Sequence, residues 1–449
     1  MPALQNYRLS EVAEVLNAEL IGEDKDFTAV NTDSRSLQNG ELFIALKGPN
    51  FDGHAYVSSA EEKGATAAMV EHVLDVSLPQ ITVSDTHEAL GKLARARREA
   101  FHGKLVGLTG SNGKTTVKEL IASILRLKGK VLATQGNLNN DIGLPLTLLK
   151  LENDEQFAVL EMGANHFGEI SYLTNIACPD VAVITNAGAA HLEGFGDIEG
   201  VANAKSEIFQ GLKADGVAII NADDKYADLW REKTAQYKQI SFSRESANAD
   251  VTASDIEMSP EHVAFSLHAG NESVSIKLHL SGLHNVSNAL AAGSVAFALG
   301  LDLATIKNGL EAFAGVKGRQ NVMHLPNGAV VIDDAYNANL DSVKAGIDVL
   351  STYAGHRVLV LGDLFEVGAQ SEAVHAEIGS YAKTQGVDEL LAVGDMSLNA
   401  VNAFGANAKH FADKAELAKF LKPALQAESV VLVKGSRGMR MEDVIQSIS

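Results

Sequence analysis

The segment that most constrains the fold joins an apolar run to a glycine-rich turn and then to a helix. Residues 105–109 read LVGLT, the turn reads GSNG, and KTTVKELIASIL follows with apolar residues at helical spacing. Such a turn lets backbone N–H groups and a helix N-terminus face a phosphate, while Lys114 adds charge and Thr115 offers a hydroxyl to Mg²⁺. We therefore predict a phosphate-binding loop for ATP or GTP.

This loop departs from the complete phosphate-loop consensus at one position. The spacing G-x-x-x-x-G-K-[ST] would place glycine at 108, where the chain has Leu108. The strand, loop and helix order is nevertheless the context that the motif needs, and the alternative is a purely structural glycine-rich turn. The predicted phosphate contacts are Gly110, Ser111, Asn112, Gly113, Lys114, Thr115 and Thr116.

The strand pattern around the loop predicts an α/β protein. Apolar runs at 157–161, 181–185 and 217–220 alternate with helical stretches, as in a parallel sheet covered on both faces. Residues from about 250 to 280 alternate polar and apolar, which predicts an antiparallel hairpin. From about 315 the strand–helix rhythm resumes. We predict a small α/β domain over 1–84, a central parallel-sheet ATPase domain with the hairpin over 85–314, and a Rossmann-like α/β domain over 315–449.

Composition limits the classes of partner. The 449 residues include 37 Lys and Arg against 57 Asp and Glu, a net charge of −20. Attachment to nucleic acid or to an anionic membrane through a general positive field is therefore excluded. Anionic ligands must be held locally, by backbone amides, a few cations and metal ions. The single cysteine, Cys178, forms no internal disulfide, and residues 1–16 lack the pattern of a secretory signal. We expect a cytoplasmic location.

Three residues beyond the loop are candidates for its chemistry. Glu161 ends the strand at 157–161 and is either a metal ligand or a solvated strand-end acid. His191 follows another strand, where a lone histidine is more often structural or exposed. Lys205, in AKSEIF, has the pattern of a helix-surface lysine beside Glu207. Sequence position alone does not favour a catalytic or metal-binding role for any of the three.

The motifs together resemble a known family. They occur in the order TGSNGKTT, EMGANHFGE, TNAGAAHLEGFG, AKSEIF, GLHNVSNALAA, GVKGRQ and IDDAYNAN. This series is similar to that of the Mur ligase family, ATP-dependent amide ligases that build the peptidoglycan stem peptide. The segments TDSR (32–35), GNLNNDIGLPLTLL (136–149) and DDAYNANLDSV (333–343) most resemble the member that joins D-Ala-D-Ala to UDP-MurNAc-tripeptide. The Asp-Asn-Pro-Arg motif of the preceding ligase is not found.

The resemblance implies a catalytic and metal-binding set. It assigns two Mg²⁺ ions to Thr115, Glu161, His191 and Lys205, with Lys205 carbamylated so that its nitrogen carries an anionic carboxylate. A bare ammonium beside two divalent cations would be repelled, whereas a carbamate would be attracted. The catalytic residues implied in this way are Lys114, Glu161, His191 and Lys205.

The resemblance also implies the nucleotide contacts. Asn285 and Asn288 correspond to the adenine side, with helix capping as the structural alternative. Arg319 corresponds to a γ-phosphate contact and Asp334 to the ribose-binding acid. Asn337, with Tyr336 and Asn339 nearby, sets the nucleotide or the incoming dipeptide. Strand-end residues of the last domain are weaker candidates for the dipeptide, with solvated loop charges as the alternative: Asp363, Glu366, His375, Lys434, Ser436 and Arg437.

The expected holders of the nucleotide sugar lie in the first domain and just after the phosphate loop. Amides, hydroxyls and a guanidinium suit a diphosphate and a uracil, and the alternative is a surface turn. These residues are Ser34, Arg35, Lys47, Asp52, Gly53, His54 and Asn137.

The reaction implied is ATP-dependent amide formation through an acyl phosphate. We expect a monomer that binds neither nucleic acid nor membrane. One alternative is another Mur ligase or a folylpolyglutamate synthetase, although the latter would not need TDSR and KGPNFDGH. A second is a non-catalytic nucleotide switch, which would not need the set Glu161, His191 and Lys205. The third residue of the stem peptide, diaminopimelate or lysine, stays open.

Overall fold

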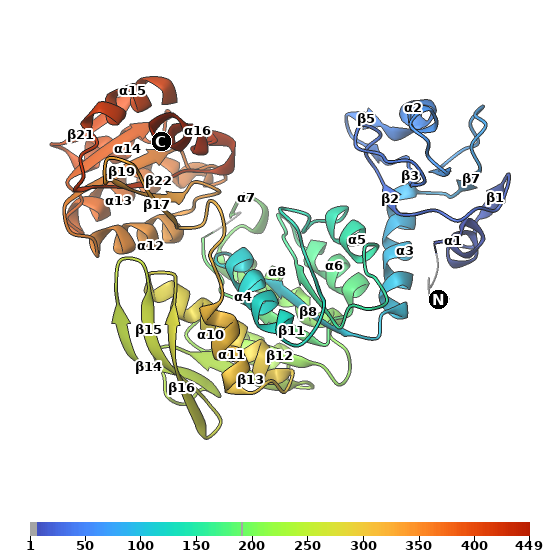
Figure 1. Ribbon diagram of the computed structural model, residues 1–449, viewed down its shortest axis with the longest axis horizontal. Coiled ribbons are helices and arrows are strands. Elements are labelled where there is room, and N and C mark those ends of the chain that lie inside the picture. The colour runs from blue at the N-terminus through green and yellow to red at the C-terminus, as the bar shows by residue number, and fades with distance from the viewer. Residues whose placement is uncertain (1–6, 190–191) are drawn as a thin grey trace.

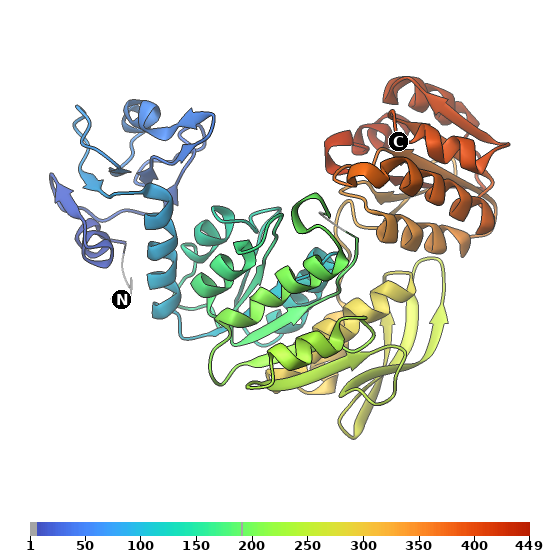
Figure 2. The same ribbon diagram turned by 180° about the vertical axis from the view of Figure 1, so that it is seen from behind.

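The computed structural model describes residues 7–189 and 192–449. It contains three large sheets, each covered by helices, arranged in an arc (Figures 1 and 2). The α/β class and the three-domain architecture predicted from the strand pattern are confirmed. Within the described ranges, no helix has the length and apolar character needed to cross a membrane.

The N-terminal sheet has the strand order β1-β7-β6-β3-β2. Its strands are β1 (Glu19–Ile21), β2 (Val30–Asn31), β3 (Leu42–Ile44), β6 (Ala67–Val70) and β7 (Gln80–Thr82), with a separate hairpin of β4 (Lys47–Gly48) and β5 (Phe51–Asp52). Its helices are α1 (Leu9–Leu16), η1 (Gly53–Tyr56) and α2 (Val57–Glu62). Strands β2 and β3 are parallel neighbours, so the loops 32–36 and 45–54 that follow them emerge at one edge of the sheet.

Helix α3 (Thr86–Ala100) joins this body to the central one (Figure 1). It packs against α1 on one side, and against α5 (Gly143–Leu148) and α6 (Glu169–Ala177) on the other. A buried ion pair ties its end to the central sheet, because Arg98 Nη2 lies 3.1 Å from Asp180 Oδ2.

The central sheet has nine strands in the order β16-β15-β14-β13-β12-β11-β8-β10-β9. They are β8 (Lys104–Thr109), β9 (Val131–Ala133), β10 (Phe157–Glu161), β11 (Val181–Ile184), β12 (Val217–Asn221), β13 (Lys238–Ser243), β14 (Val251–Met258), β15 (Val263–Ala269) and β16 (Glu272–Leu278). Strands β8 to β14 run parallel to their neighbours, and β14, β15 and β16 pair antiparallel. The predicted hairpin is therefore confirmed as the extension of this sheet.

Helices cover both faces of the central sheet. One core lies under α4 (Lys114–Arg126), α10 (Leu283–Ala298) and α11 (Leu303–Glu311). The other core lies under α3, α5 and α6 and under three more helices, α8 (Ile198–Ser206), η2 (Glu207–Gly211) and α9 (Ala227–Lys233). The short helix α7 (Leu192–Phe195) precedes α8. Because successive strand residues face opposite sides, Leu105 belongs to one core and Val106 to the other.

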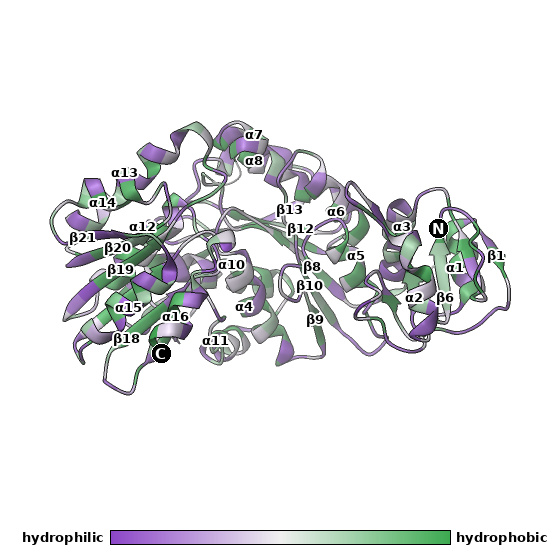
Figure 3. Cartoon of the chain, turned by 90° about the horizontal axis from the view of Figure 1, so that it is seen from above, coloured by the Kyte–Doolittle hydropathy of each residue, from purple (hydrophilic) through white to green (hydrophobic). Residues whose placement is uncertain are grey.

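The C-terminal sheet has the order β17-β18-β22-β19-β20-β21, in which only β17 runs antiparallel to its neighbour. Its strands are β17 (Asn321–His324), β18 (Val330–Asp334), β19 (His356–Gly362), β20 (Glu389–Val393), β21 (Ala408–Phe411) and β22 (Ser429–Lys434). Its helices are α12 (Leu340–Ser351), η3 (Gly368–Gln370), α13 (Ser371–Thr384), α14 (Leu398–Phe404), α15 (Lys414–Ala424), η4 (Arg437–Met439) and α16 (Glu442–Ile448). Hydrophobic residues fill the strands, as Figure 3 shows in green.

Candidate active site

The phosphate loop lies at the C-terminal end of β8, between that strand and α4. Leu108 is fully buried within β8, so the turn begins only at Gly110, which explains the departure from the longer consensus. Gly113 has φ +80°, and a Cβ there would lie 2.3 Å from Asn288 Oδ1. A Cβ at Gly110 would lie 1.8 Å from Thr185 Oγ1. Both glycines are therefore required by backbone conformation or by close approach.

Lys114 folds back over the loop that it follows. Its ammonium donates to the carbonyl oxygens of Gly110, at 2.8 Å, and Ser111, at 3.4 Å. Burial lowers the pKa of Lys114, Glu161 acts in the opposite direction, and Arg319 lowers it further. Within the described residues, the hydrogen bonds of this ammonium go to carbonyl oxygens of its own loop, and it can exchange them for phosphate oxygens.

Glu161 faces the loop and is not a solvated strand-end acid. Its residue exposure is 3 %, and its Oε2 accepts a hydrogen bond of 3.1 Å from Thr115 Oγ1. Asn139 Nδ2 donates to the other carboxylate oxygen at 2.9 Å. The pair Glu161 and Thr115 thus presents a carboxylate and a hydroxyl together, which are hard oxygen donors of the kind that Mg²⁺ prefers.

Lys205 is buried, so its interpretation as a helix-surface lysine is wrong. It lies on α8 with 2 % exposure, and within the described part of the chain no carboxylate forms an ion pair with it. Burial lowers its pKa well below the usual value, and the nearby charge of Lys114 lowers it further. The amine is therefore driven toward its neutral, nucleophilic form.

His191 lies outside the described residues, so its predicted place beside the loop stays a prediction. Over residues 7–189 and 192–449, no group of three or more His, Cys, Asp and Glu side chains gathers in a form that could hold a metal ion. Of the predicted metal ligands that lie within the described residues, Glu161 supplies a carboxylate. Its neighbour Thr115 supplies a neutral hydroxyl oxygen.

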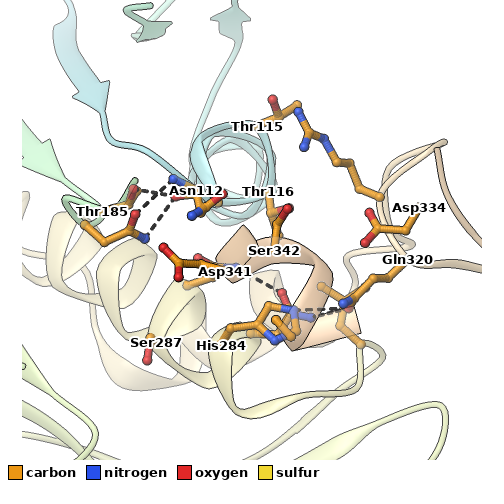
Figure 4. A pocket seen from close by; sticks show the side chains of 18 of the residues that line it. Asn112, Thr115, Thr116, Thr185, His284, Ser287, Gln320, Asp334, Asp341 and Ser342 are labelled. Carbon is orange, nitrogen blue, oxygen red and sulfur yellow. Dashed lines mark hydrogen bonds between the residues drawn. The ribbon is translucent and has the colours of Figure 1, made fainter. Parts of the chain in front are cut away.

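A cavity of about 350 Å³ opens beside the loop, between the central and C-terminal bodies (Figure 4). Its walls come from the loop, from the start of α10, from the segment 316–320 and from the ends of β18 and β22. The predicted nucleotide contacts that line it are Asn112, Gly113, Thr115, Thr116, Asn285, Asn288, Arg319 and Asp334. Residues separated by more than 200 positions therefore share one cavity.

Asn285 and Asn288 do not cap α10, because Gly282 occupies the N-cap and no side chain caps it. Asn288 Nδ2 donates to Asn285 Oδ1 at 3.0 Å, and Asn285 Nδ2 donates to Gln320 Oε1 at 3.1 Å. His284 Nε2 also lies 3.1 Å from Gln320 Oε1, and burial lowers the pKa of this histidine. Gln320, which belongs to the C-terminal body, thus closes a polar network over the start of α10.

Asp334 forms a buried ion pair at the floor of this cavity. Its Oδ2 lies 2.7 Å from Lys434 Nζ, and the two residues are paired across β18 and β22. Their exposures are 6 % and 1 %, and burial lowers the pKa of Lys434. Both charges are largely removed from bulk water, so each depends on the other.

We expect Lys434→Met to reduce the free energy of unfolding by about 3–5 kcal/mol, because it leaves the Asp334 carboxylate buried without its counter-ion. Urea denaturation followed by circular dichroism measures the change. Asp334→Asn combined with Lys434→Met should cost less, since no charge is then left alone. As a control, Lys130→Ala removes an exposed pair with Glu152 and should cost less than about 1 kcal/mol. A Lys434→Met loss as small as that of the control would contradict the expectation.

A second cavity of about 340 Å³ lies on the other side of Arg319. The phosphate loop contributes Lys114 to it, and the C-terminal body contributes Asn337, Phe365, Glu366, Ser436 and Arg437. Arg319 lines both cavities, together with Asn112, Gly113 and Ser342. Across this cleft, Asn339 Nδ2 donates to Asn112 Oδ1 at 2.8 Å, a direct bond between the C-terminal body and the phosphate loop.

Two candidates for the dipeptide side have structural roles instead. Asp363 is buried, and its Oδ1 accepts a bond of 2.7 Å from the amide of Ser397. His375 is fully buried, donates from Nδ1 to the Ser371 carbonyl and accepts at Nε2 from the Leu364 amide. These bonds fix the loops after β19 and leave neither side chain facing the second cavity.

The predicted sugar-binding residues of the N-terminal body lie in the two loops that leave one sheet edge. Arg35 is 89 % exposed along its side chain and pairs with Asp33 at 2.8 Å, whereas Ser34 is buried. Hydrogen bonding from the Arg35 side chain lowers the pKa of Asp33 to about 2. Lys47 lies opposite Asp52 in the register of the β4–β5 hairpin, and Gly53 follows directly. Asn137 lies in the loop that carries Asn139.

His54 is held on both sides within its own body. Its Nδ1 lies 2.6 Å from Asp52 Oδ1, and its Nε2 accepts from the amide of Glu71 at 2.9 Å. Both ring nitrogens are thereby used to fix the loop. A larger cavity, of about 1120 Å³, lies between the N-terminal and central bodies, and its lining includes Tyr7, Asn31 and Arg97.

Several residues at the site were not identified from the sequence. Asn139, which orients Glu161, belongs to the segment GNLNN in which only Asn137 was selected. His284 directly precedes Asn285 in HNVSN, and Gln320 directly follows Arg319. Their motifs pointed to the correct loops, but the individual contacts depend on side-chain directions that spacing does not determine.

Comparisons with known proteins agree with this geometry. The Mur ligase family's catalytic, middle and glutamate ligase domain models match residues 26–98, 108–296 and 318–437. The UDP-N-acetylmuramoyl-tripeptide–D-alanyl-D-alanine ligase of Escherichia coli (strain K12) is 44% identical over 98% of each chain. The enzyme of that name from Bacillus subtilis (strain 168) is 34% identical, also over 98% of both.

Solved structures give the same result. A MurF from Acinetobacter baumannii superposes with a TM-score of 0.94 at 37% identity, covering 100% of this chain and 99% of that one. A MurF ligase from Thermotoga maritima, in complex with ADP, has a TM-score of 0.84 at 31% identity, over 94% and 96%. A folylpolyglutamate synthase of Mycobacterium tuberculosis shares only the fold, at 15% identity and a TM-score of 0.65 over 80% of this chain and 94% of that one. The chain therefore belongs to the Mur ligase family, among its UDP-N-acetylmuramoyl-tripeptide–D-alanyl-D-alanine ligases.

Proposed function

We propose that the protein joins D-Ala-D-Ala to the terminal carboxylate of UDP-MurNAc-tripeptide, converting ATP to ADP and phosphate, in the cytoplasmic synthesis of peptidoglycan. The observation that carries the proposal is the position of Arg319. This cation from the C-terminal body lines both the nucleotide cavity beside the phosphate loop and the second cavity, as part of the wall that the two share. Such a wall is where a γ-phosphoryl group leaving ATP would meet its acceptor.

The first step activates the acceptor carboxylate. A carboxylate oxygen attacks the γ-phosphorus, the bond to the β-phosphate oxygen breaks, and an acyl phosphate and ADP form. Lys114 and Arg319 neutralise the charge that spreads over the transferred oxygens, and the loop amides hold the β-phosphate. The protein contributes position and charge, with no covalent intermediate on its own side chains.

The second step forms the amide. The amine of D-Ala-D-Ala attacks the activated carbonyl, a tetrahedral intermediate forms, and phosphate leaves with the oxygen that came from the carboxylate. The attacking nitrogen loses its proton as the bond forms. Asn112 and Asn339 hold the C-terminal body against the phosphate loop, which keeps water away from the acyl phosphate.

We propose that two Mg²⁺ ions bind beside the loop. Thr115 and Glu161 would hold one ion, and we propose that a carbamate on Lys205, together with His191, holds the other. When bound, Mg²⁺ supplies positive charge to the phosphate oxygens. Support for the carbamate comes from burial, because the Lys205 amine lies at 2 % exposure beside Lys114, where an ammonium is unfavourable.

We propose the following nucleotide contacts. The loop residues Gly110 to Thr116 hold the phosphates, Asn285 and Asn288 lie on the adenine side, and Asp334 binds the ribose. Support comes from the single cavity that these side chains line with Arg319. We assign Asn337 to the acceptor side of the transferred phosphoryl group, and support comes from its position in the lining of the second cavity.

We propose that the three bodies divide the substrates among themselves. Residues 1–84 would bind the UDP-sugar through Ser34, Arg35, Lys47, Asp52 and Gly53, with His54 fixing the loop and Asn137 approaching from the central domain. Residues 85–314 would bind ATP, and 315–449 the dipeptide. Arg437 supports the last assignment, because it is the cation of the second cavity that lies apart from the phosphate loop and matches the dipeptide carboxylate. We propose a monomer as the working form.

A coupling assay with product identification tests the function. The enzyme is given ATP, UDP-MurNAc-tripeptide and D-Ala-D-Ala, and the product is identified by mass spectrometry. We expect UDP-MurNAc-pentapeptide, with ADP formed in equal amount and little turnover when either substrate is omitted. Tripeptides ending in diaminopimelate or lysine are compared in parallel, because the structure leaves that residue open. ATP hydrolysis indifferent to both substrates would contradict the proposal and favour a nucleotide switch.

A further inference from the structure

Tyr336 lies against two arginines at the wall between the nucleotide cavity and the second cavity. The guanidinium carbon of Arg319 is 4.3 Å from the centroid of the Tyr336 ring, and that of Arg437 is 5.5 Å from it. Both distances fall within the range of roughly 6 Å over which a cation is attracted to an aromatic ring. Among the described residues that line either cavity, Tyr336 is not found. The ring contacts that the structure describes for Tyr336 are those with the two arginines.

The backbone of Tyr336 also supports the turn that carries Arg319. The Tyr336 amide donates to the Gly318 carbonyl at 3.2 Å, and the Arg319 amide donates to the Val316 carbonyl at 3.0 Å. Gly318 has φ +75°, so residues 316–319 match a type II turn, which requires a positive φ at its third position. A Cβ at Gly318 would lie 3.2 Å from the Cβ of Tyr336. Turn and ring are thus packed together.

Arg437 is held from the same short loop. Its amide donates to Asn337 Oδ1 at 3.2 Å, and its Nη1 donates to Glu442 Oε1 at 2.8 Å. Its side chain is nevertheless 59% exposed and lines the second cavity, so these bonds leave part of the guanidinium available to a ligand. The Tyr336 ring consequently restrains two arginines, Arg319 from the turn 316–319 and Arg437 from the loop after β22.

The two arginines face different partners in the proposed reaction, on which this inference rests. Arg319 borders the nucleotide and the transferred phosphoryl group, whereas Arg437 borders only the second cavity. Amide formation requires the acyl phosphate and the dipeptide amine to meet within bonding distance. A long, flexible side chain held by a ring loses less freedom when it binds a ligand.

We propose that Tyr336 is a positioning residue that sets Arg319 and Arg437 relative to each other, so that the phosphoryl group and the dipeptide carboxylate are held in register. The aromatic ring carries this role, and the hydroxyl is dispensable. Tyr336 touches no substrate, and its effect passes through the two guanidinium groups.

The test compares Tyr336→Leu with Tyr336→Phe. The leucine variant removes the ring and keeps an apolar side chain, and we expect kcat/KM for D-Ala-D-Ala and for ATP to fall about tenfold each. KM for UDP-MurNAc-tripeptide, which binds mainly elsewhere, should not change. The phenylalanine variant keeps the ring and should restore both values to within about twofold of the original enzyme. Tyr336→Met replaces the leucine variant if that protein does not fold.

Double-mutant cycles separate positioning from packing. In an Arg319→Ala background, Tyr336→Leu should cause no further loss in kcat/KM for ATP, and in an Arg437→Ala background none in that for the dipeptide. The inference would be overturned if Tyr336→Leu lowered kcat/KM by the same factor in both arginine-to-alanine backgrounds as in the original enzyme. A Tyr336→Phe enzyme as impaired as Tyr336→Leu would also overturn it. If the original enzyme couples the dipeptide and the Tyr336→Leu enzyme has the same kcat/KM for both ATP and D-Ala-D-Ala, only this inference fails. If the original enzyme does not couple it, the proposed function fails first.

Discussion

Replacing Lys205 by alanine should lower the rate of ATP-dependent amide formation by roughly a thousandfold or more, which is the size expected when a preorganised charge at a phosphoryl-transfer site is lost. Lys205 is 2 % exposed on α8, and burial, with the nearby Lys114, depresses its pKa. A neutral amine can add CO₂, whereas an ammonium cannot. The anionic carbamate would then offset the charge of Lys114 and hold Mg²⁺.

The control variants for Lys205 separate the carbamate from simple packing. Lys205→Arg keeps length and charge but cannot be carbamylated, so it should be as inactive as alanine. Acetate or formate added to Lys205→Ala should restore part of the rate, because a free carboxylate can enter the space that the side chain leaves. Lys128→Ala, a change at a lysine with a 44% exposed side chain, should leave the rate unchanged. A fully active Lys205→Arg enzyme would contradict the carbamate.

A spectroscopic measurement reports the carbamate without relying on activity. The enzyme is equilibrated with ¹³C-labelled bicarbonate, and a carbamate carbonyl resonance is sought by NMR. We expect one such resonance that is lost in Lys205→Ala. A spectrum identical for both proteins would show that the anionic group is absent from this position.

The second large effect concerns Lys114. We expect Lys114→Met to lower kcat/KM for ATP by about a thousandfold, because the ammonium would bond phosphate oxygens in a site largely closed to water. In the structure its Nζ bonds the carbonyl of Gly110 at 2.8 Å, so the loop keeps the charge in place before ATP arrives. Methionine keeps the length of the side chain and removes only the charge. Steady-state kinetics and calorimetric titration with ATP measure the loss.

Lys118 provides a matched control on the same helix. It is 2 % exposed, pairs with Glu119 at 3.0 Å, and its Nζ bonds the carbonyl of Thr134 away from the nucleotide cavity. Lys118→Met should therefore lower the unfolding temperature while it leaves the affinity for ATP unchanged. If both methionine variants bind ATP equally well, the position assigned to Lys114 is wrong.

The sequence predicts the framework of the site because local patterns specify it. An apolar run followed by glycines and a helical period places a loop at the end of β8, and parallel neighbours then bring Glu161 to the same sheet edge. Arg319 and Asp334 follow the same logic, since they lie in or beside strand ends of the C-terminal body. Short strands such as β9 and β1, with three residues each, have too few positions for a pattern to show.

The remaining features depend on packing between distant segments. Lys205 has the sequence surroundings of an exposed lysine, yet it is buried on α8 and close enough to Lys114 for that charge to lower its pKa. Glu161 is oriented by Asn139, which lies 22 positions away, and Asp334 is balanced by Lys434, which lies 100 positions away. The place of Tyr336 between two arginines likewise arises where three loops meet. No local period reports such contacts.

Isotope transfer tests the central claim, amide formation through an acyl phosphate, most directly. UDP-MurNAc-tripeptide is prepared with ¹⁸O in its terminal carboxylate and is turned over with ATP and D-Ala-D-Ala. If the carboxylate attacks the γ-phosphorus, one labelled oxygen leaves with each phosphate, and mass spectrometry detects singly labelled phosphate in step with amide product. Amide product accompanied by unlabelled phosphate would contradict the acyl phosphate and with it the account of the site.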